Sequence, residues 1–194
     1  MRILQIHLSV PNGGAYICVK NLSYGFNKIG IKSEEVFNNP IKKLMDFDYD
    51  SVLVHSFRGR NIDQYIETLN FLDKYKIPHI ILLHDYWPIC VQTNLISYKN
   101  GIQECKEIDC HPDKCNYSCN KNNIDYINIK KTKEIYSIIK DRKTVCFNKY
   151  SVDIFKNRGF SNIKLIHHGV NLDLFKPDNK NKEDFTVLFT NAWG

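Results

Sequence analysis

The sequence predicts an α/β fold built on a doubly wound parallel sheet. Short β-rich segments alternate with amphipathic segments of helical period along most of the 194 residues. The segment 78–84 (PHIILLH) is apolar on both faces, as a central parallel strand must be. Because 43% of the residues are hydrophobic, the chain can bury a core, which excludes a disordered tail and a fibrous protein.

The first half of the chain contains four expected strands. Residues 2–8 form a β-rich run that ends in turn formers, so a strand and a glycine turn are predicted there. Further strands are expected over 31–37, 51–55 and 78–84. A helix after the turn presents Ala15, Val19, Leu22, Phe26 and Ile29 on one face and is closed by Gly30. A second helix is capped by Asn61, and its apolar face is Ile62, Ile66, Leu69 and Leu72.

The alternation resumes after residue 123. A helix is expected over 124–140, followed by a strand over 143–147, a helix over 152–158 and a strand over 162–167. On the first of these helices the residues expected to face inward are Ile124, Ile127, Ile135 and Ile138, and those expected to face outward are Lys130, Lys131 and Lys133. Cys18 and Cys146 fall within a helix and a strand, which indicates packed core residues.

Two segments break the pattern. Residues 86–123 have weak periodicity, and a loop of that length inside a compact domain requires something to hold it. The charged stretch 176–184 precedes one more apolar run over 185–190. A polar linker followed by a single strand suggests the start of another domain.

The charge argues against a nucleic-acid partner. The net charge of +6 comes from 27 Lys and Arg against 21 Asp and Glu, and these are spread along the chain. Nucleic-acid sites instead gather cations on one face. No long apolar run or signal-peptide core occurs, so we expect a cytoplasmic protein. The lysines of 124–140 leave open a peripheral contact with anionic lipid at the inner face of the membrane.

Cysteines are concentrated in the segment 86–123, which holds Cys90, Cys105, Cys110, Cys115 and Cys119. Without a signal peptide disulfides are disfavoured, so a structural Zn²⁺ held by four thiolates is the leading interpretation. Such a metal would also hold the long loop. Free thiols, an iron–sulfur cluster and the disulfides of a hyperthermophile stay open as alternatives. No catalytic metal is expected.

Two positions suit ligand binding. Gly13 and Gly14 lie between the first strand and its helix, where unpaired amides and the helix dipole favour a phosphate. A tight turn would also explain paired glycines. His84 and Asp85 follow the central strand, at the edge where open α/β sheets bind ligands. The imidazole could donate to a sugar hydroxyl or shuttle a proton, with Asp85 fixing its tautomer, or it could simply cap the strand.

The chain resembles the family 4 glycosyltransferases of GT-B fold, which are retaining enzymes that use nucleotide sugars. The resemblance is carried by 84–90 (HDYWPIC) and by 166–177 (IHHGVNLDLFKP), where His168 and Asn171 replace an Asn and an Asp of the family signature. It covers the N-terminal half of that architecture. It implies a Rossmann-like acceptor-side domain over 1–175 with a Cys-rich insertion over 86–123, an interdomain linker over 176–184 and the first strand of a donor domain over 185–194.

The resemblance also implies roles for individual residues. Gly13 and Gly14 would face the donor diphosphate, and His84 and Asp85 would serve catalysis by reaching toward the donor sugar and the acceptor. An interdomain hinge would contain His168, Gly169 and Asn171. The zinc ligands favoured by resemblance are Cys90, Cys105, Cys115 and Cys119, with Cys110 as the alternate.

The implied activity is transfer of a sugar from a nucleotide-sugar donor to a saccharide or lipid-linked acceptor, with retention of configuration. We expect no turnover by the 194-residue chain alone, because the cations that grip the donor would lie on a further domain or a partner subunit. Two other classes stay open. One is a metal-stapled α/β binding module without catalysis, and the other is a zinc-dependent nucleic-acid binder, whose affinity would fall steeply with salt.

Overall fold

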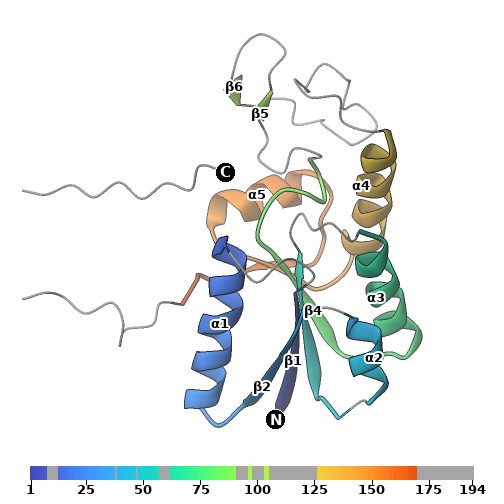
Figure 1. The fold of residues 1–194 in the computed structure, drawn as a ribbon. Helices are drawn as coiled ribbons and strands as arrows, with labels where there is room; N and C mark the ends of the chain where they lie inside the picture. The colour runs from blue at the N-terminus through green and yellow to red at the C-terminus, as the bar shows by residue number, and fades with distance from the viewer. Residues whose placement is uncertain are drawn as a thin grey trace, which may run out of the picture.

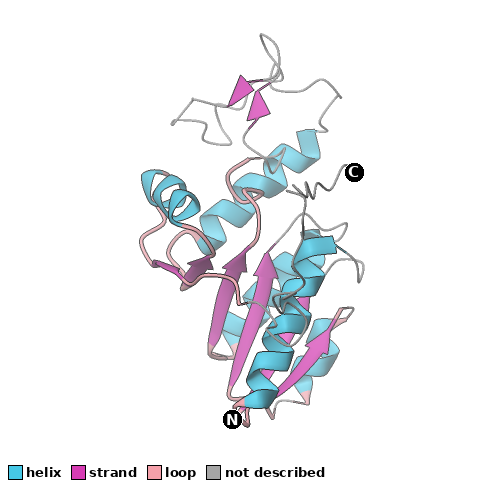
Figure 2. Cartoon of the chain, turned by 90° about the vertical axis from the view of Figure 1, so that its left-hand side faces the viewer, coloured by secondary structure: helices cyan, strands magenta, loops and turns pink. Residues whose placement is uncertain are grey.

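A parallel sheet forms the centre of the molecule (Figures 1 and 2). The computed structural model describes residues 1–7, 13–37, 39–46, 48–56, 62–90, 96–97, 103–104 and 126–169. Within these residues, six parallel strands are joined in the order β2-β1-β3-β4-β7-β8. Their bounds are β1 Arg2–His7, β2 Lys32–Val36, β3 Ser51–Ser56, β4 His79–Leu83, β7 Thr144–Cys146 and β8 Ile163–Leu165. The predicted parallel α/β architecture is therefore confirmed, and it is consistent with a Rossmann-like fold.

Helices connect these strands, and four of them were expected from the sequence. The described helices are α1 Gly13–Lys28, α2 Pro40–Met45, α3 Ile62–Lys74, α4 Tyr126–Ile139 and α5 Lys149–Asn157. The short helix α2 was not expected; its first residue is a proline, whose fixed φ suits the first turn of a helix. The expectation for Ile29 was wrong, because α1 ends before it and the side chain is 71% exposed.

The larger core lies on the sheet face covered by α2, α3, α4 and α5. Alternate strand residues such as Leu4, Val54 and Ile81 point to this face and pack against helix residues such as Leu69 and Ile135. Figure 1 shows α2, α3 and α4 on one side of the strands and α1 on the other. The predicted apolar face of α3 is confirmed. Among the side chains described over 130–139 of α4, the fully buried isoleucines are Ile135 and Ile139, whereas the expected Ile138 is partly buried.

The opposite face is covered by α1 alone among the described helices. Its apolar residues Ile3, Leu53, Leu82 and Val145 meet Leu22 and other side chains of α1. The cause is topological, because right-handed crossovers that run in opposite directions along a sheet place their helices on opposite faces. Only the connection from β1 to β2 runs toward the β2 edge, whereas every later crossover carries the chain toward β8. The described helices therefore leave part of this face uncovered.

A change of direction also occurs between β1 and β3. The chain leaves β1 for the neighbouring edge strand β2 and then returns to form β3 on the other side of β1. In open α/β sheets, ligands bind beyond the carboxyl ends of the strands at such a switch point. His7 and His55 are paired in the register of β1 with β3 and lie at this edge.

Several expectations fall on residues outside the described ranges. These are Asn61, Asn171, the linker 176–184, the strand 185–194 and the cysteines Cys105, Cys110, Cys115 and Cys119. Within 86–123, the structure describes the first five residues and an antiparallel pair formed by β5 Ile96–Ser97 and β6 Gln103–Glu104. Cys18 and Cys146 are buried, as predicted, and Cys90 is also buried.

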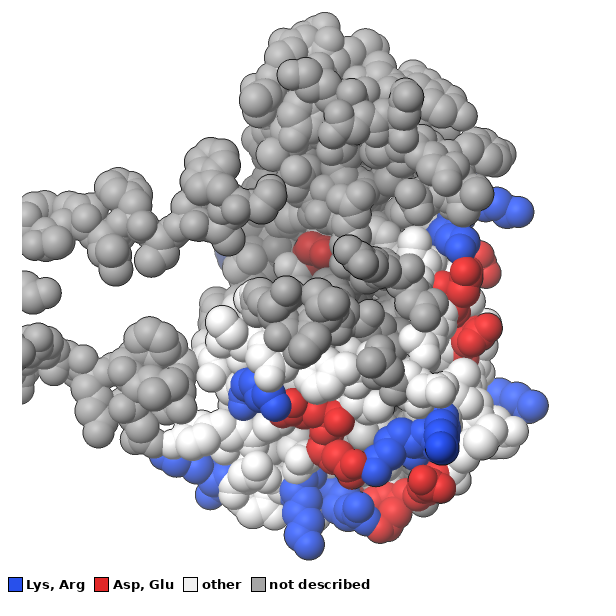
Figure 3. Space-filling model, in the orientation of Figure 1, with Lys and Arg blue, Asp and Glu red and all other residues white. Residues whose placement is uncertain are grey.

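Charges of both signs lie close together on the face of the molecule shown in Figure 3. Figure 3 shows Lys and Arg interspersed with Asp and Glu, and several are paired, as Lys20 is with Glu35 and Lys43 with Glu34. On α4, Lys131 lies 2.7 Å from Asp63 of α3, so it does not contribute an unpaired cation to the expected basic face. Among the described residues, no helix has the length and apolar character needed to cross a membrane.

Candidate functional site

Histidines gather at the carboxyl edge of the sheet. His7 ends β1, His55 lies near the end of β3, His84 follows β4 directly, and His168 follows β8. Carboxyl ends of parallel strands meet at one edge, so four of the seven histidines in the chain come together. Sequence reasoning selected His84 and His168 but missed His7 and His55. Their recurrence at the ends of successive expected strands was the available signal.

His55 and His84 form a direct hydrogen bond. The Nδ1 atom of His55 lies 2.8 Å from Nε2 of His84. Their ring centroids are 5.1 Å apart and their planes differ by 9°. Since the two nitrogens lie so much closer than the centroids, the rings meet edge to edge in one plane, which is the geometry of an N–H···N hydrogen bond. The position of His84 is therefore set by a side chain from the neighbouring strand.

The histidine pair is connected to a buried glutamine. The Oε1 atom of Gln5 on β1 accepts from Nε2 of His55 at 3.1 Å. The Nε2 atom of Gln5 donates to Ser23 of α1 and to Ser33 of β2, at 2.8 and 2.9 Å. A buried amide is costly unless it is hydrogen-bonded, and these contacts satisfy it. Sequence reasoning did not select Gln5, because a single polar residue in an apolar strand has no characteristic pattern.

Burial keeps these imidazoles neutral. Desolvation lowers the pKa of His84 to about 3, with smaller contributions from His168 and His7. It lowers the pKa of His7 to about 4, against an opposing effect of Glu35, and places the pKa of His55 well below its ordinary value. At neutral pH, His84 is thus a polar but uncharged group in the site, and it has no second proton to give.

Asp85 has a local structural contact. Its Oδ1 atom accepts from the backbone N–H of Trp87 at 2.9 Å, at the start of the turn that leads to Cys90. We expected Asp85 to fix the tautomer of the His84 imidazole. In the structure, the hydrogen-bonding partner of that ring is His55. Asp85 nevertheless lines the same pocket as His84, and a catalytic role for it stays a prediction.

A polar pocket of about 260 Å³ lies between the end of β4 and the start of α5. Its polar wall includes His84, Asp85, Asn148 and Ser151. Asn148 caps α5 by accepting from the backbone N–H of Ser151 at 2.7 Å, and the Ser151 hydroxyl lies 2.9 Å from the Tyr86 hydroxyl. The wall therefore offers imidazole, amide, hydroxyl and carboxyl groups, which can form hydrogen bonds with hydroxyl groups of a ligand.

His168 connects the polar pocket with helix α1. Its ring stacks on Phe147, with centroids 3.8 Å apart and planes within 12°. Its Nδ1 atom lies 3.5 Å from the sulfur of Cys18 on α1. Burial raises the pKa of Cys18 to about 11, so the thiol keeps its proton. Which of the two atoms donates is set by the tautomer of His168. A role for His168 and Gly169 in an interdomain hinge stays a prediction.

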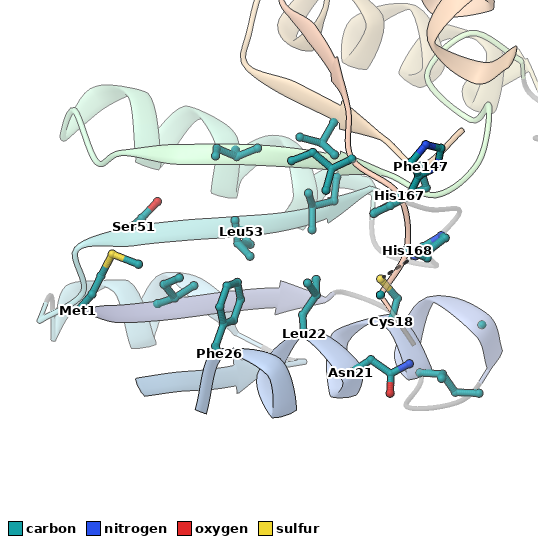
Figure 4. A pocket seen from close by; sticks show the side chains of 18 residues that line it. Met1, Cys18, Asn21, Leu22, Phe26, Ser51, Leu53, Phe147, His167 and His168 are labelled. Atoms are coloured by element: carbon teal, nitrogen blue, oxygen red, sulfur yellow. Dashed lines mark hydrogen bonds between the residues drawn. The ribbon is translucent and has the colours of Figure 1, made fainter. Parts of the chain in front are cut away.

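An apolar groove of about 650 Å³ lies on the sheet face that α1 covers only in part (Figure 4). Leu53, Ile80, Leu82 and Val145 form its floor, and Leu22 and Phe26 line it from α1. Figure 4 shows the groove running along the strands from Met1 and Ser51 toward His168. It shares Phe147 and His168 with the polar pocket, so the two hollows are adjacent.

Gly14 lines the groove at the start of α1. It belongs to the helix and is absent from the described residues with positive φ, and a Cβ atom there would meet nothing within 4 Å. Neither a tight turn nor internal packing therefore requires glycine at this position. The structure brings Gly14, His168 and Gly169 to one groove and His84, Asp85 and His168 to the adjoining pocket.

A metal site cannot be assembled from the described residues. No group of three or more His, Cys, Asp or Glu side chains is arranged to hold an ion in that part of the chain. Of the five cysteines proposed as ligands, the structure describes only Cys90, which lies in the main core with Trp87 and Ile89. The zinc site thus stays a prediction.

Comparisons of the chain with protein-family models, with curated proteins and with solved structures found no match.

Proposed function

We propose that this chain forms the acceptor-side domain of a retaining glycosyltransferase that uses a nucleotide-sugar donor. The observation that carries the proposal is a neutral His84, held at the carboxyl end of a central strand in a pocket of hydroxyl, amide and carboxyl groups. The site lies at the sheet edge favoured by ligands in open α/β folds. The HDYWPIC and IHHGVNLDLFKP segments, which resemble family 4 glycosyltransferases, supply residues to the same two hollows.

The proposed chemistry assigns binding and orientation to this domain. In a retaining transfer of this kind, negative charge develops on the leaving diphosphate while the anomeric carbon becomes positive. Amides at the start of α1, next to Gly14, would stabilise part of that negative charge. His84, being neutral, would orient a sugar hydroxyl through a hydrogen bond rather than protonate the leaving group. Further cations would have to neutralise the rest of the diphosphate.

The apolar groove favours an acceptor with an apolar tail. Such a groove, lined mainly by apolar side chains with a few polar groups at one end, is typical of a small-molecule site. Because the groove and the polar pocket share Phe147 and His168, a single acceptor could place its polar head near His84 and its tail on Leu53 and Leu82. We therefore propose a lipid-linked acceptor in preference to a free saccharide.

Binding to the ¹⁵N-labelled chain is the direct test. The chain is titrated with UDP-, GDP- and ADP-linked sugars, and the backbone and imidazole resonances are followed by NMR, which detects weak binding. We expect at least one donor to shift resonances of Gly14 and His84. Gly14→Ala is expected to weaken that binding roughly tenfold, the effect of about 1.4 kcal/mol, because its methyl group obstructs approach to the amides.

Gly25→Ala is the matched control. Gly25 lies in the same helix, is exposed, and also has nothing within 4 Å of an added Cβ atom. Both substitutions favour helix formation, so both are expected to leave folding intact. Only Gly14→Ala should affect binding. If no donor perturbs Gly14 or His84, or if both alanine variants bind equally well, the proposed function is wrong.

A further inference from the structure

A continuous set of hydrogen bonds leads from the surface of α1 to His84. Its members, in order, are Lys20, Glu35, Ser23, Gln5, His55 and His84. A carboxylate accepts hydrogen bonds and has no proton to donate, so the direction of donation is defined where the series meets Glu35. The donor and the acceptor of each following hydrogen bond are then determined in turn.

The first links orient the Gln5 amide. Glu35 accepts from Lys20 at 2.6 Å and from the Ser23 hydroxyl at 2.7 Å. Ser23 has one proton, and it is used in the bond to Glu35. The Ser23 oxygen must therefore accept from the Gln5 atom that lies 2.8 Å away, which identifies that atom as Nε2. The same nitrogen lies 3.3 Å from the carbonyl oxygen of Val19, which can only accept.

The amide orientation then places the proton on His55. With its nitrogen turned toward α1, Gln5 presents Oε1 to Nε2 of His55 at 3.1 Å. An amide oxygen only accepts, so the Nε2 atom of His55 carries the hydrogen. His55 is 1% exposed, and desolvation keeps its pKa well below the ordinary value, so the ring has a single N–H. Its Nδ1 atom is left with a lone pair.

The last link determines the proton on His84. Nδ1 of His55 accepts, so Nε2 of His84, at 2.8 Å, must donate. We propose that Gln5 and His55 are positioning residues that hold His84 as the Nε2–H tautomer, so that its Nδ1 atom is a hydrogen-bond acceptor for a hydroxyl group of a ligand. No hydrogen bond to this Nδ1 is found within the described part of the chain. A phosphate or carboxylate oxygen without a proton is disfavoured at this atom.

The proton assignment is independent of the proposed function, which enters only in identifying the hydroxyl as that of a sugar. It is tested on the full chain with ¹⁵N-labelled histidine. Two-bond ¹H–¹⁵N correlation spectra at neutral pH distinguish the two tautomers by the shifts of the ring nitrogens, and loss of one set of signals in His84→Asn assigns His84. We expect His55 and His84 each to be the Nε2–H form. An Nδ1–H form of His84, or averaging between two forms, would overturn the proposal.

Gln5→Met tests the positioning role. Methionine is of similar length but lacks the acceptor that fixes the proton of His55, so His84 is expected to populate both tautomers. Ser33→Ala is the matched control, because it removes a contact of the same amide nitrogen while the bond to Ser23 still orients Gln5. A single tautomer of His84 in folded Gln5→Met would overturn the role of Gln5.

If Gln5→Met does not fold, the unmodified chain decides the matter through the ¹⁵N–¹⁵N coupling across the hydrogen bond between His55 and His84. We expect this coupling, and we expect the hydrogen of the bond to be attached to Nε2 of His84. A hydrogen attached to Nδ1 of His55 would refute the proposal. None of these spectra requires a sugar. A chain that binds no nucleotide sugar but shows the expected tautomers would refute the proposed function and leave this inference intact.

Discussion

His55 and His84 share a hydrogen bond in which the two imidazole planes differ by only 9°. His55 lies on β3 and His84 directly follows the neighbouring strand β4, 29 positions further along the chain. Their contact turns a histidine at a strand end into part of a buried polar network, which includes Gln5 and reaches α1. Such a network restricts the orientation of each side chain in it, because a buried polar group that loses its hydrogen bond destabilises the fold.

Acidification is expected to unfold the chain through these histidines. The folded-state pKa values of His84 and His7, about 3 and about 4, lie below the ordinary value of 6.5. The unfolded chain therefore binds protons first as the pH falls. The stabilisation is present above about pH 6.5 and is lost toward about pH 4, with a slope of up to about 1.4 kcal/mol per pH unit for each buried imidazole.

Urea unfolding at a series of pH values between about 7 and 5 measures this slope. His7→Gln removes one buried imidazole and should make the slope shallower. His79→Gln serves as the control, since His79 lies at the opposite end of β4, where its Nδ1 contacts the Ile77 carbonyl. A free energy of unfolding that does not change over this pH range would contradict the prediction.

Gly159→Ala is expected to destabilise the chain more than Gly30→Ala. Both glycines have positive φ, of 85° and 77°, where alanine costs about 1 kcal/mol or more. At Gly159 the new Cβ would also lie 3.2 Å from the Tyr136 hydroxyl, which is held by its hydrogen bond to the Arg158 carbonyl at 2.7 Å. At Gly30 it would meet nothing within 4 Å. Thermal unfolding compares the two variants.

A double-mutant cycle isolates the contact with Tyr136. In a Tyr136→Phe background the hydroxyl is gone, so the extra cost of Gly159→Ala over Gly30→Ala should disappear. An equal difference in both backgrounds would show that backbone strain, rather than the hydroxyl, causes it.

Ile80→Trp is expected to abolish binding of an amphiphile to the apolar groove. Ile80 lines the groove from β4, and an indole there would fill part of its volume of about 650 Å³. Binding of dodecyl glucoside, whose head group is a sugar, should be seen by calorimetry with the unmodified chain and lost in this variant. Ile29→Trp is the control, because Ile29 is exposed and lies outside the groove. Equal binding by both variants would argue against the proposed acceptor class.

The cysteine-rich segment is expected to hold about one Zn²⁺ per chain, bound tetrahedrally by thiolates. Elemental analysis of the purified chain measures it. Cys115→Ser should remove the metal, whereas Cys146→Ala should retain it, because Cys146 is buried in β7. Metal-free protein in which the five cysteines of this segment titrate as free thiols would contradict the zinc assignment.

Local periodicity in the sequence was sufficient for most of the fold. The strands β1, β3 and β4 and the helices α1 and α3 could be recognised because each is a short run with its own apolar pattern, bounded by turn formers or helix ends. The position of His84 at a strand end followed from the same pattern, and so did the burial of Cys18 and Cys146. The inward face of α4 was harder to predict than its extent, because several isoleucines could occupy that face.

Tertiary structure alone decided which of these elements meet. Gln5 and His55 lie on two strands and His84 follows a third, and nothing in their spacing along the chain indicates that they would form one network. The order of the strands brought them to the same edge. The direction of the crossovers placed α1 alone, among the described helices, on one face and so left the groove open. The handedness of a connection acts between distant segments, which no local pattern relates.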